Sequence, residues 1–161
     1  MCGIRFNRGS SAWMLSLSLF VTGCEQPSRA DLTLTQVQET VEQFDHALET
    51  MNSALLVPLV SPTVIATFHE PGSKQMTRYM GSAYLALLRD VLEHANSYIR
   101  KQDATKLHLH PSKKSAQVTA RIHEHIEIAG QIHSTDEHET LTIELIDGKA
   151  LITSIDRESV K

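Results

Sequence analysis

Leu-Thr-Ile-Glu-Leu-Ile-Asp-Gly-Lys-Ala-Leu-Ile-Thr-Ser-Ile, residues 141–155, gives the clearest indication of strand pairing in the sequence. Asp147-Gly148 separates two runs that are rich in branched apolar residues. A type I′ turn needs positive φ at both of its central residues, and Asp-Gly is one of the pairs that provide it. We therefore predict a β-hairpin in which Ile143 pairs with Ile152.

The segment before this hairpin alternates in the same way. If Pro111-Ser112-Lys113-Lys114 forms a loop, Leu107 opposes Val118, and the apolar residues of both strands share one face. In the later hairpin, Leu151 and Ile155 are left on the opposite face. We expect a protein partner or a second copy of the chain to cover that outer face of the sheet.

Amphipathic helices are predicted upstream of the strands. Apolar residues recur at steps of three and four from Thr35 to Met51, with Thr35 as N-cap and Gln38 completing a capping box. A shorter helix over residues 54–59, a strand over residues 63–68 and a third helix over residues 82–96 follow. Helices therefore precede the strand-rich half of the chain.

This order of elements resembles the nuclear transport factor 2-like superfamily, also called cystatin-like. The likeness covers residues 35–157, which we take as one folded domain and which end in the hairpin of residues 141–155. It implies an α+β fold in which helices pack in the concave face of a curved antiparallel sheet. In that family the sheet curls into a cone, and the hollow is a pocket that is empty in some members and catalytic in others.

The N-terminal residues have the order of a signal peptide, with two arginines before an apolar run over residues 12–21. That run is too short to span a membrane. The junction Val21-Thr22-Gly23-Cys24 resembles the lipobox of bacterial lipoproteins, in which the cysteine is lipidated and the chain is cut before it. The resemblance implies that residues 1–23 are a cleaved signal peptide, that Cys24 carries the lipid, with palmitate as an acyl chain, and that residues 24–34 are a tether.

The anchor and the net charge set the expected location. Glu25 follows the cysteine, where the inner-membrane retention signal of lipoproteins is aspartate, so the resemblance favours the periplasmic face of the outer membrane over the inner membrane. Without Arg5 and Arg8, the 15 Lys+Arg become 13 against 19 Asp+Glu, a net charge of about −6 with His neutral. This charge argues against nucleic acid as a partner and leaves the lipid anchor as the contact with the membrane.

The enzymes of the resembled superfamily give a test of catalysis. The segment around Glu70 is similar to the one in which ketosteroid isomerases carry their general base. Those enzymes also use a tyrosine on the first helix and an acid in the strand region as donors to the oxyanion, and Phe44 and Thr140 stand there instead. Without such donors the largest catalytic contribution is missing. We therefore predict that the chain is not an enzyme and that Glu70 is a solvated turn residue.

Glu124 interrupts an apolar alternation between Ile122 and Ile126. An inward charge is costly unless it is paired, so Glu124 either marks a polar point in the pocket or lies at a bulge or rim that turns it outward. The bulge or rim is the simpler interpretation. Arg78 and Tyr79 complete the pocket candidates, although their spacing does not decide the direction in which they point.

Histidines follow the strands in two pairs, each on one strand face, a spacing that can chelate zinc or copper: His108 with His110, and His123 with His125. The two pairs lie roughly 20 Å apart at ~3.3 Å per residue, so they cannot form one site. A smaller site would need His138 or Asp136 as a third ligand. We interpret the histidines as a polar outer face and predict no metal and no cofactor.

The leading hypothesis is therefore a lipid-anchored, periplasm-facing module that binds a ligand or a protein without catalysis. Two alternatives stay open. One is an enzyme of the isomerase or dehydratase type that uses Glu70 or Glu124 as its base. The other is zinc or copper binding by the histidine-rich face.

Overall fold

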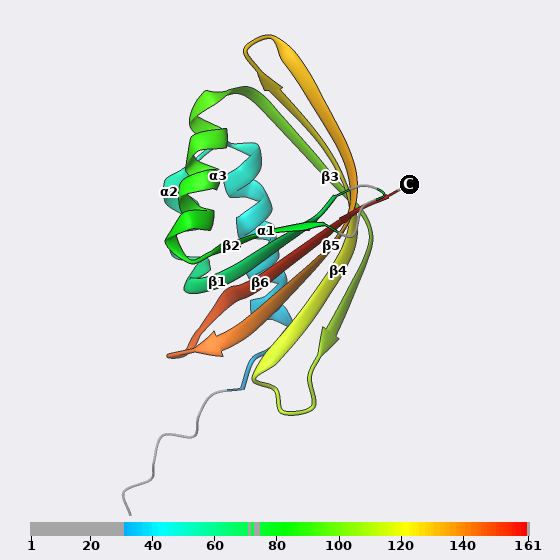
Figure 1. Ribbon diagram of the computed structural model, residues 1–161. Coiled ribbons are helices and arrows are strands. Elements are labelled where there is room, and N and C mark those ends of the chain that lie inside the picture. Colours follow the sequence, from blue (N-terminus) through cyan, green and yellow to red (C-terminus); the bar gives the residue numbers. More distant parts are fainter. Residues whose placement is uncertain (1–30, 71, 73–74, 161) are drawn as a thin grey trace, which may run out of the picture.

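The computed structural model describes residues 31–70, 72 and 75–160. Within these residues the elements are α1 (Leu34–Glu49), α2 (Ser53–Leu56), β1 (Val60–His69), β2 (Met76–Met80), α3 (Ser82–His94), β3 (Ala95–Leu109), β4 (Ser115–Ile128), β5 (Gln131–Ile146) and β6 (Lys149–Ser159). The strands form one curved sheet in the order β2-β1-β6-β5-β4-β3 (Figure 1). The helices cover its concave face, which confirms the predicted α+β architecture.

Both predicted hairpins have the predicted register. Ile143 pairs with Ile152, and the two turn residues before β6 have φ values of 49° and 78°. Leu107 pairs with Val118 across the earlier loop. One correction concerns strand direction: β1 runs parallel to β6, so the sheet is mixed rather than antiparallel. Hairpins between neighbours in sequence force antiparallel pairing, whereas β1 and β6 are far apart in sequence and no hairpin sets their relative direction.

The β5–β6 ladder contains a bulge that the sequence did not predict. The register shifts between Thr142 and Ile143, and Thr153 is the extra residue on β6. Beyond the bulge the side chains of β6 exchange faces, so Ile155 pairs with Leu141 and is fully buried. The prediction that Ile155 lies on the outer face is therefore wrong.

α1 begins earlier than predicted. Thr33, not Thr35, is the N-cap: its Oγ1 accepts the N–H of Gln36 at 3.2 Å, and Gln36 Oε1 accepts the N–H of Thr33 at 2.9 Å. Gln36 rather than Gln38 therefore completes the capping box. The chain already packs on the domain at Leu32, which is buried and donates its N–H to the β3–β4 loop at 2.8 Å.

Two strand segments lie where none was predicted. β2 forms a hairpin with β1 and is one edge of the sheet. β3 is the other edge and continues directly from α3, about twelve residues before the short strand expected near Leu107. Its pairing with β4 is interrupted between Asp103 and Lys106, where Ala104 has a φ of 52°. Polar residues on this exposed edge hid the strand from a search for apolar alternation.

The apolar core lies between the helices and the concave face of the sheet. Its largest buried side chains include Phe44, Leu48, Tyr84, Ile122, Leu141, Ile143 and Ile152. No helix in the described part of the chain is long and apolar enough to cross a membrane. The predicted signal peptide and Cys24 lie outside the described residues.

Candidate functional site

A group of buried charges occupies part of the concave face. Glu124 on β4 is 4% exposed, and β4 pairs with β5 from Ser115 to Ile128 without a register shift. The bulge or rim position predicted for Glu124 is therefore wrong, because the residue keeps the alternation of its strand and points inward with Ile122. Its charge is offset by pairing with arginines on two other strands.

Strand register brings these charges together. Arg100 of β3 is directly opposite Glu124 of β4, and Glu139 of β5 is directly opposite Arg157 of β6. These four residues and two neighbouring acids form what we call the buried charge cluster: Asp45, Arg100, Glu124, Glu137, Glu139 and Arg157. Four adjacent strands and α1 therefore all contribute to one polar region in an otherwise apolar interior.

Arg100 contacts three carboxylates. Its Nε donates to Asp45 at 2.8 Å, its Nη1 to Glu124 at 2.6 Å and its Nη2 to Glu139 at 2.5 Å. The side chain is only 1% exposed. A guanidinium group presents N–H donors in several fixed directions, which lets one arginine pair with acids from a helix and from two strands.

Arg157, on β6, pairs with two of the acids that Arg100 also contacts. Its Nε donates to Glu139 at 2.8 Å and its Nη1 to Glu124 at 3.0 Å. Its Nη1 also lies 3.7 Å from Glu137. Four carboxylates thus face two guanidinium groups, and the two acids that each contact only one arginine of the cluster are Asp45 and Glu137. The excess negative charge therefore lies at these two positions.

The carboxylates of the cluster differ in pKa. Burial alone would raise the pKa of Glu124, but Arg157 and Arg100 together lower it below its ordinary value. A carboxylate that is held ionised in this way is a weak base. Burial raises the pKa of Asp45 and that of Glu137, and the nearby arginines offset only part of the effect. These two are therefore the stronger bases.

Asp45 also lines a groove between α1 and β3. The groove has a volume of about 320 Å³, which is at the lower end for small-molecule sites. The side chain of Asp45 is 22% exposed, and Gln102 Nε2 donates to its Oδ2 at 2.6 Å. Arg100 and Gln102 fix the orientation of this carboxylate. Its other lining residues include Gln38, Val41, Glu42, Leu107 and Val118.

Two tyrosines border the cluster. The Tyr98 hydroxyl donates to Glu124 at 2.5 Å. Tyr84 is fully buried beside the ring of Phe68, with centroids 6.4 Å apart, and its hydroxyl has no hydrogen-bond partner among the described residues. Burial raises the pKa of both hydroxyls. Both tyrosines are therefore neutral at physiological pH and can donate a hydrogen bond but not act as bases.

The remaining pocket candidates lie outside the buried charge cluster. Glu70 is exposed where β1 ends, and Arg78 is exposed on β2. Tyr79 is half-buried with its ring 5.9 Å from that of Phe68, centroid to centroid. These residues lie along the β1–β2 hairpin at one edge of the sheet, because β2 is an edge strand. The structure does not bring them together with Glu124.

The histidine pairs make local polar contacts. His123 lies between Asp136 and Asp103, with its Nε2 3.3 Å from the latter. His125 Nδ1 is 2.7 Å from the hydroxyl of Ser134. Among residues 31–70, 72 and 75–160, no group of three or more His, Cys, Asp or Glu side chains could hold a metal ion. The geometry thus gives the zinc or copper alternative no support.

Comparisons with known proteins rest on the structure, since no sequence family and no curated protein matches the chain. A proposed scytalone dehydratase from Novosphingobium aromaticivorans aligns with a TM-score of 0.66 at 11% identity, over 79% of this chain and 83% of its own. A superfamily member from Salmonella enterica gives 0.64 at 14%, over 79% and 90%. LinA gives 0.64 at 14%, over 79% and 85%.

The chain has the nuclear transport factor 2-like fold. This finding corrects the prediction that the chain is not an enzyme, because proteins with the nuclear transport factor 2-like fold are named as dehydratases and as a hydroxylase. The absence of donors at Phe44 and Thr140 speaks only against the oxyanion arrangement of the ketosteroid isomerases. The interior of this chain holds other polar groups, those of the buried charge cluster.

Sequence reasoning identified Glu124 and missed the other members of the cluster. A signal was present for one of them: Glu139 stands two residues before Leu141, and residues two apart on a strand share a face, so its charge had to lie beside an inward apolar neighbour. Arg157 had no such signal, because strict alternation placed Ile155, two residues before it, on the outer face. Thr140, which was compared with the acid of the isomerases, points to the other face of β5.

Proposed function

We propose that the α1–β3 groove is an acid–base site in which Asp45 removes a proton from a carbon next to a carbonyl group, as in an isomerase or a dehydratase. One observation carries this proposal: a single carboxylate combines a raised pKa, an orientation fixed by Arg100 and Gln102, and access to a groove. A general base works best when its pKa approaches the working pH. Burial raises the pKa of Asp45 and so brings it closer to the working pH.

The lining of the groove defines the class of substrate. Val41, Leu107 and Val118 offer an apolar wall. The Gln102 amide has two N–H groups; one holds Asp45, and the other can donate to the carbonyl oxygen on which negative charge develops. The acids Asp45 and Glu42 in the same groove disfavour an anionic substrate. The expected substrate is therefore a small, uncharged or cationic carbonyl compound.

Asp45→Asn is expected to lower the rate of proton abstraction by about 100-fold or more, because the amide cannot accept the proton. The rate is measured by proton NMR in D₂O, as the loss of α-proton signals from a panel of small aldehydes, ketones and β-hydroxyketones. The last group also reports loss of water as a new alkene signal. Catalysed exchange of at least one compound by the wild-type protein is the expected result.

Glu49→Gln is the matched control, since Glu49 is an exposed carboxylate one turn further along α1 and outside the groove. Its rate should equal that of the wild type. The wild-type rate should rise with pH through the pKa of Asp45, because only the ionised form accepts a proton, with an inflection above the ordinary value of 3.8. Exchange that survives in Asp45→Asn, a ¹³C-detected Asp45 titration at or below 3.8, or a wild-type protein inert to the whole panel would contradict the proposal.

We infer further that a lipid on Cys24 holds this domain at the periplasmic face of the outer membrane. The inference is supported by the lipobox-like residues 21–24 and by Glu25 after them. Leu32 is the first buried residue of the described chain, so only a short segment separates it from Cys24. Each buried methylene of an acyl chain contributes about 0.8 kcal/mol, and two or three chains make a lasting attachment.

Cys24→Ala is expected to abolish both palmitate labelling and recovery in the membrane fraction, because the acylated thiol is lost. Cys2→Ala is the matched control: Cys2 lies in the predicted signal peptide, so this variant should keep the label and the membrane association. Mass spectrometry of the mature protein should show an acylated N-terminal cysteine. An unmodified Cys24 in the wild type would refute the anchor.

A further inference from the structure

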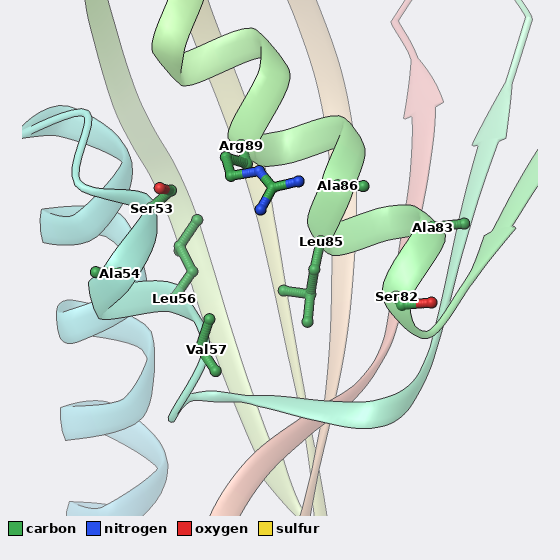
Figure 2. A pocket seen from close by; sticks show the side chains of 9 residues that line it. All are labelled: Ser53, Ala54, Leu56, Val57, Ser82, Ala83, Leu85, Ala86 and Arg89. Atoms are coloured by element: carbon green, nitrogen blue, oxygen red, sulfur yellow. The ribbon is translucent and has the colours of Figure 1, made fainter.

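A second groove lies between α2 and α3 (Figure 2) and has a volume of about 650 Å³. It is separate from the Asp45 groove, which lies between α1 and β3. Its polar lining residues are Ser53, Ser82 and Arg89, and six apolar side chains form the rest of its walls: Ala54, Leu56, Val57, Ala83, Leu85 and Ala86. In Figure 2, Val57 and Leu85 face one another across it. Three of the six side chains are only methyl groups, which leaves a gap between the two helices.

The apolar wall of this groove is partly exposed. Val57, which follows the last turn of α2, is 62% exposed, whereas Leu56 beside it in the lining is buried. An apolar surface that a domain does not bury itself favours an apolar ligand, because covering it removes apolar area from water. The groove therefore suits a hydrocarbon chain.

Arg89 is the charged residue of the lining. It lies on α3 one turn after Leu85, and its guanidinium group extends over one end of the groove (Figure 2). Its ion pair with Glu93 is long, 3.9 Å from Nε to Oε1, and the two side chains are 62% and 61% exposed. Pairs of this kind contribute little. The guanidinium group is therefore open to a second carboxylate, which it can bind through two parallel hydrogen bonds.

Charge distinguishes this groove from the two beside α1. Glu42 and Asp45 line the α1–β3 groove, and Glu42 also lines the groove between α1 and α2. The α2–α3 groove has an arginine and no acid among its lining residues. An anion with an apolar tail is therefore repelled from the first two grooves and attracted to the third.

We propose that the α2–α3 groove binds a medium-chain fatty acid, with its carboxylate on Arg89 and its tail between the two helices. The lining on α3 runs from Ser82 to Arg89, about 10 Å at 1.5 Å per residue, which matches a tail of medium length. This site is independent of the Asp45 groove. The chain would then bind two kinds of ligand: an uncharged or cationic carbonyl compound beside Asp45 and an anionic fatty acid beside Arg89.

Isothermal titration with decanoate tests the site. The wild-type protein should bind decanoate saturably at one site, and Arg89→Gln should weaken that binding about tenfold or more, because a charge-assisted pair is lost. Decanol should bind wild type and Arg89→Gln equally, since it has no charge. Arg78→Gln is the matched control: Arg78 is an exposed arginine on β2, outside the groove, and its loss should leave decanoate affinity unchanged.

Ala86→Leu provides a steric test. Ala86 is exposed on α3, so leucine is tolerated by the fold, as circular dichroism should confirm, but it narrows the groove and should weaken decanoate and decanol alike by about tenfold. Asp45→Asn should bind decanoate as the wild type does. The proposal is overturned by absence of saturable decanoate binding, by equal effects of Arg89→Gln and Arg78→Gln, by full affinity in Ala86→Leu, or by weakened binding in Asp45→Asn.

Discussion

Arg157→Met is expected to lower the free energy of unfolding by about 3–5 kcal/mol, because it removes one partner from a buried ionic network. Arg157 pairs with Glu139 at 2.8 Å and with Glu124 at 3.0 Å, and the side chains of these acids are 2% and 5% exposed. Methionine replaces part of the volume and none of the charge. Among the described residues, Arg100 would then be the one cation still paired with these carboxylates, and the Tyr98 hydroxyl would still donate to Glu124. Urea unfolding monitored by circular dichroism measures the loss.

Arg121→Met is the matched control for this variant. Arg121 pairs with Asp136 at 3.0 Å, but the side chains are 43% and 42% exposed, so its loss should cost no more than about 1 kcal/mol. Equal losses in the two variants would show that the buried charge cluster contributes no more than a surface pair.

Lowering the pH should narrow the difference in the free energy of unfolding between Arg157→Met and the wild type. The fold lowers the pKa of Glu124 from its ordinary value of 4.5: burial opposes the change, but the two arginines outweigh it. The resulting stabilisation is therefore present above pH 4.5 and is lost as the pH falls through the lowered pKa. The variant lacks one of these arginines and has less of this stabilisation to lose. If the difference in the free energy of unfolding stays constant with pH, the stabilisation does not come from the lowered pKa of Glu124.

Gly81→Ala is expected to lower the free energy of unfolding by at least about 2 kcal/mol. Gly81 precedes α3 with a φ of 51°, and a Cβ there would lie 2.6 Å from the carbonyl oxygen of Pro62. The N–H of Gly81 donates to the carbonyl oxygen of Val64 at 2.7 Å, so the backbone cannot move aside without losing that bond. The penalty therefore combines positive φ with a clash against backbone.

Gly130→Ala separates these two contributions. Gly130 lies in the β4–β5 turn with a φ of 76°, and a Cβ there would meet nothing within 4 Å. The variant should cost about 1–2 kcal/mol from the backbone conformation alone. Thermal unfolding of the two variants side by side measures the excess in Gly81→Ala. No excess would mean that the segment around Pro62 adjusts to accept a methyl group.

The parts of the fold that local chemistry determines were predicted well. Asp147-Gly148 fixes the register of β5 and β6 near the turn, because a two-residue turn allows only one pairing of its flanking strands. The bulge at Thr153 has no comparable signature. It adds one residue, moves Ile155 to the core and reverses the faces of the rest of β6. A prediction that extends strict alternation past such a point fails for every later residue.

The candidate site was less predictable because it depends on pairing between distant segments. Arg100 and Glu139 lie 39 residues apart in sequence and meet only through the registers of three strands. Sequence reasoning also treats an isolated charge as exposed, since desolvation is costly, and cannot see the partners that offset the cost. Asp45 was hidden for a further reason: it lies beside Phe44 on the flank of an amphipathic helix, where charged residues are ordinary.

The interruption of β3 near Ala104 affects how readily copies of the chain can associate through this edge of the sheet. β3 is a free edge of the sheet, and a long straight edge offers its unpaired N–H and C=O groups to any neighbouring copy. The left-handed residue Ala104 breaks that row of groups, and the interruption is bounded by the charged residues Asp103 and Lys106. The break therefore makes the β3 edge a poorer template for strand-by-strand addition of neighbouring copies into a fibre.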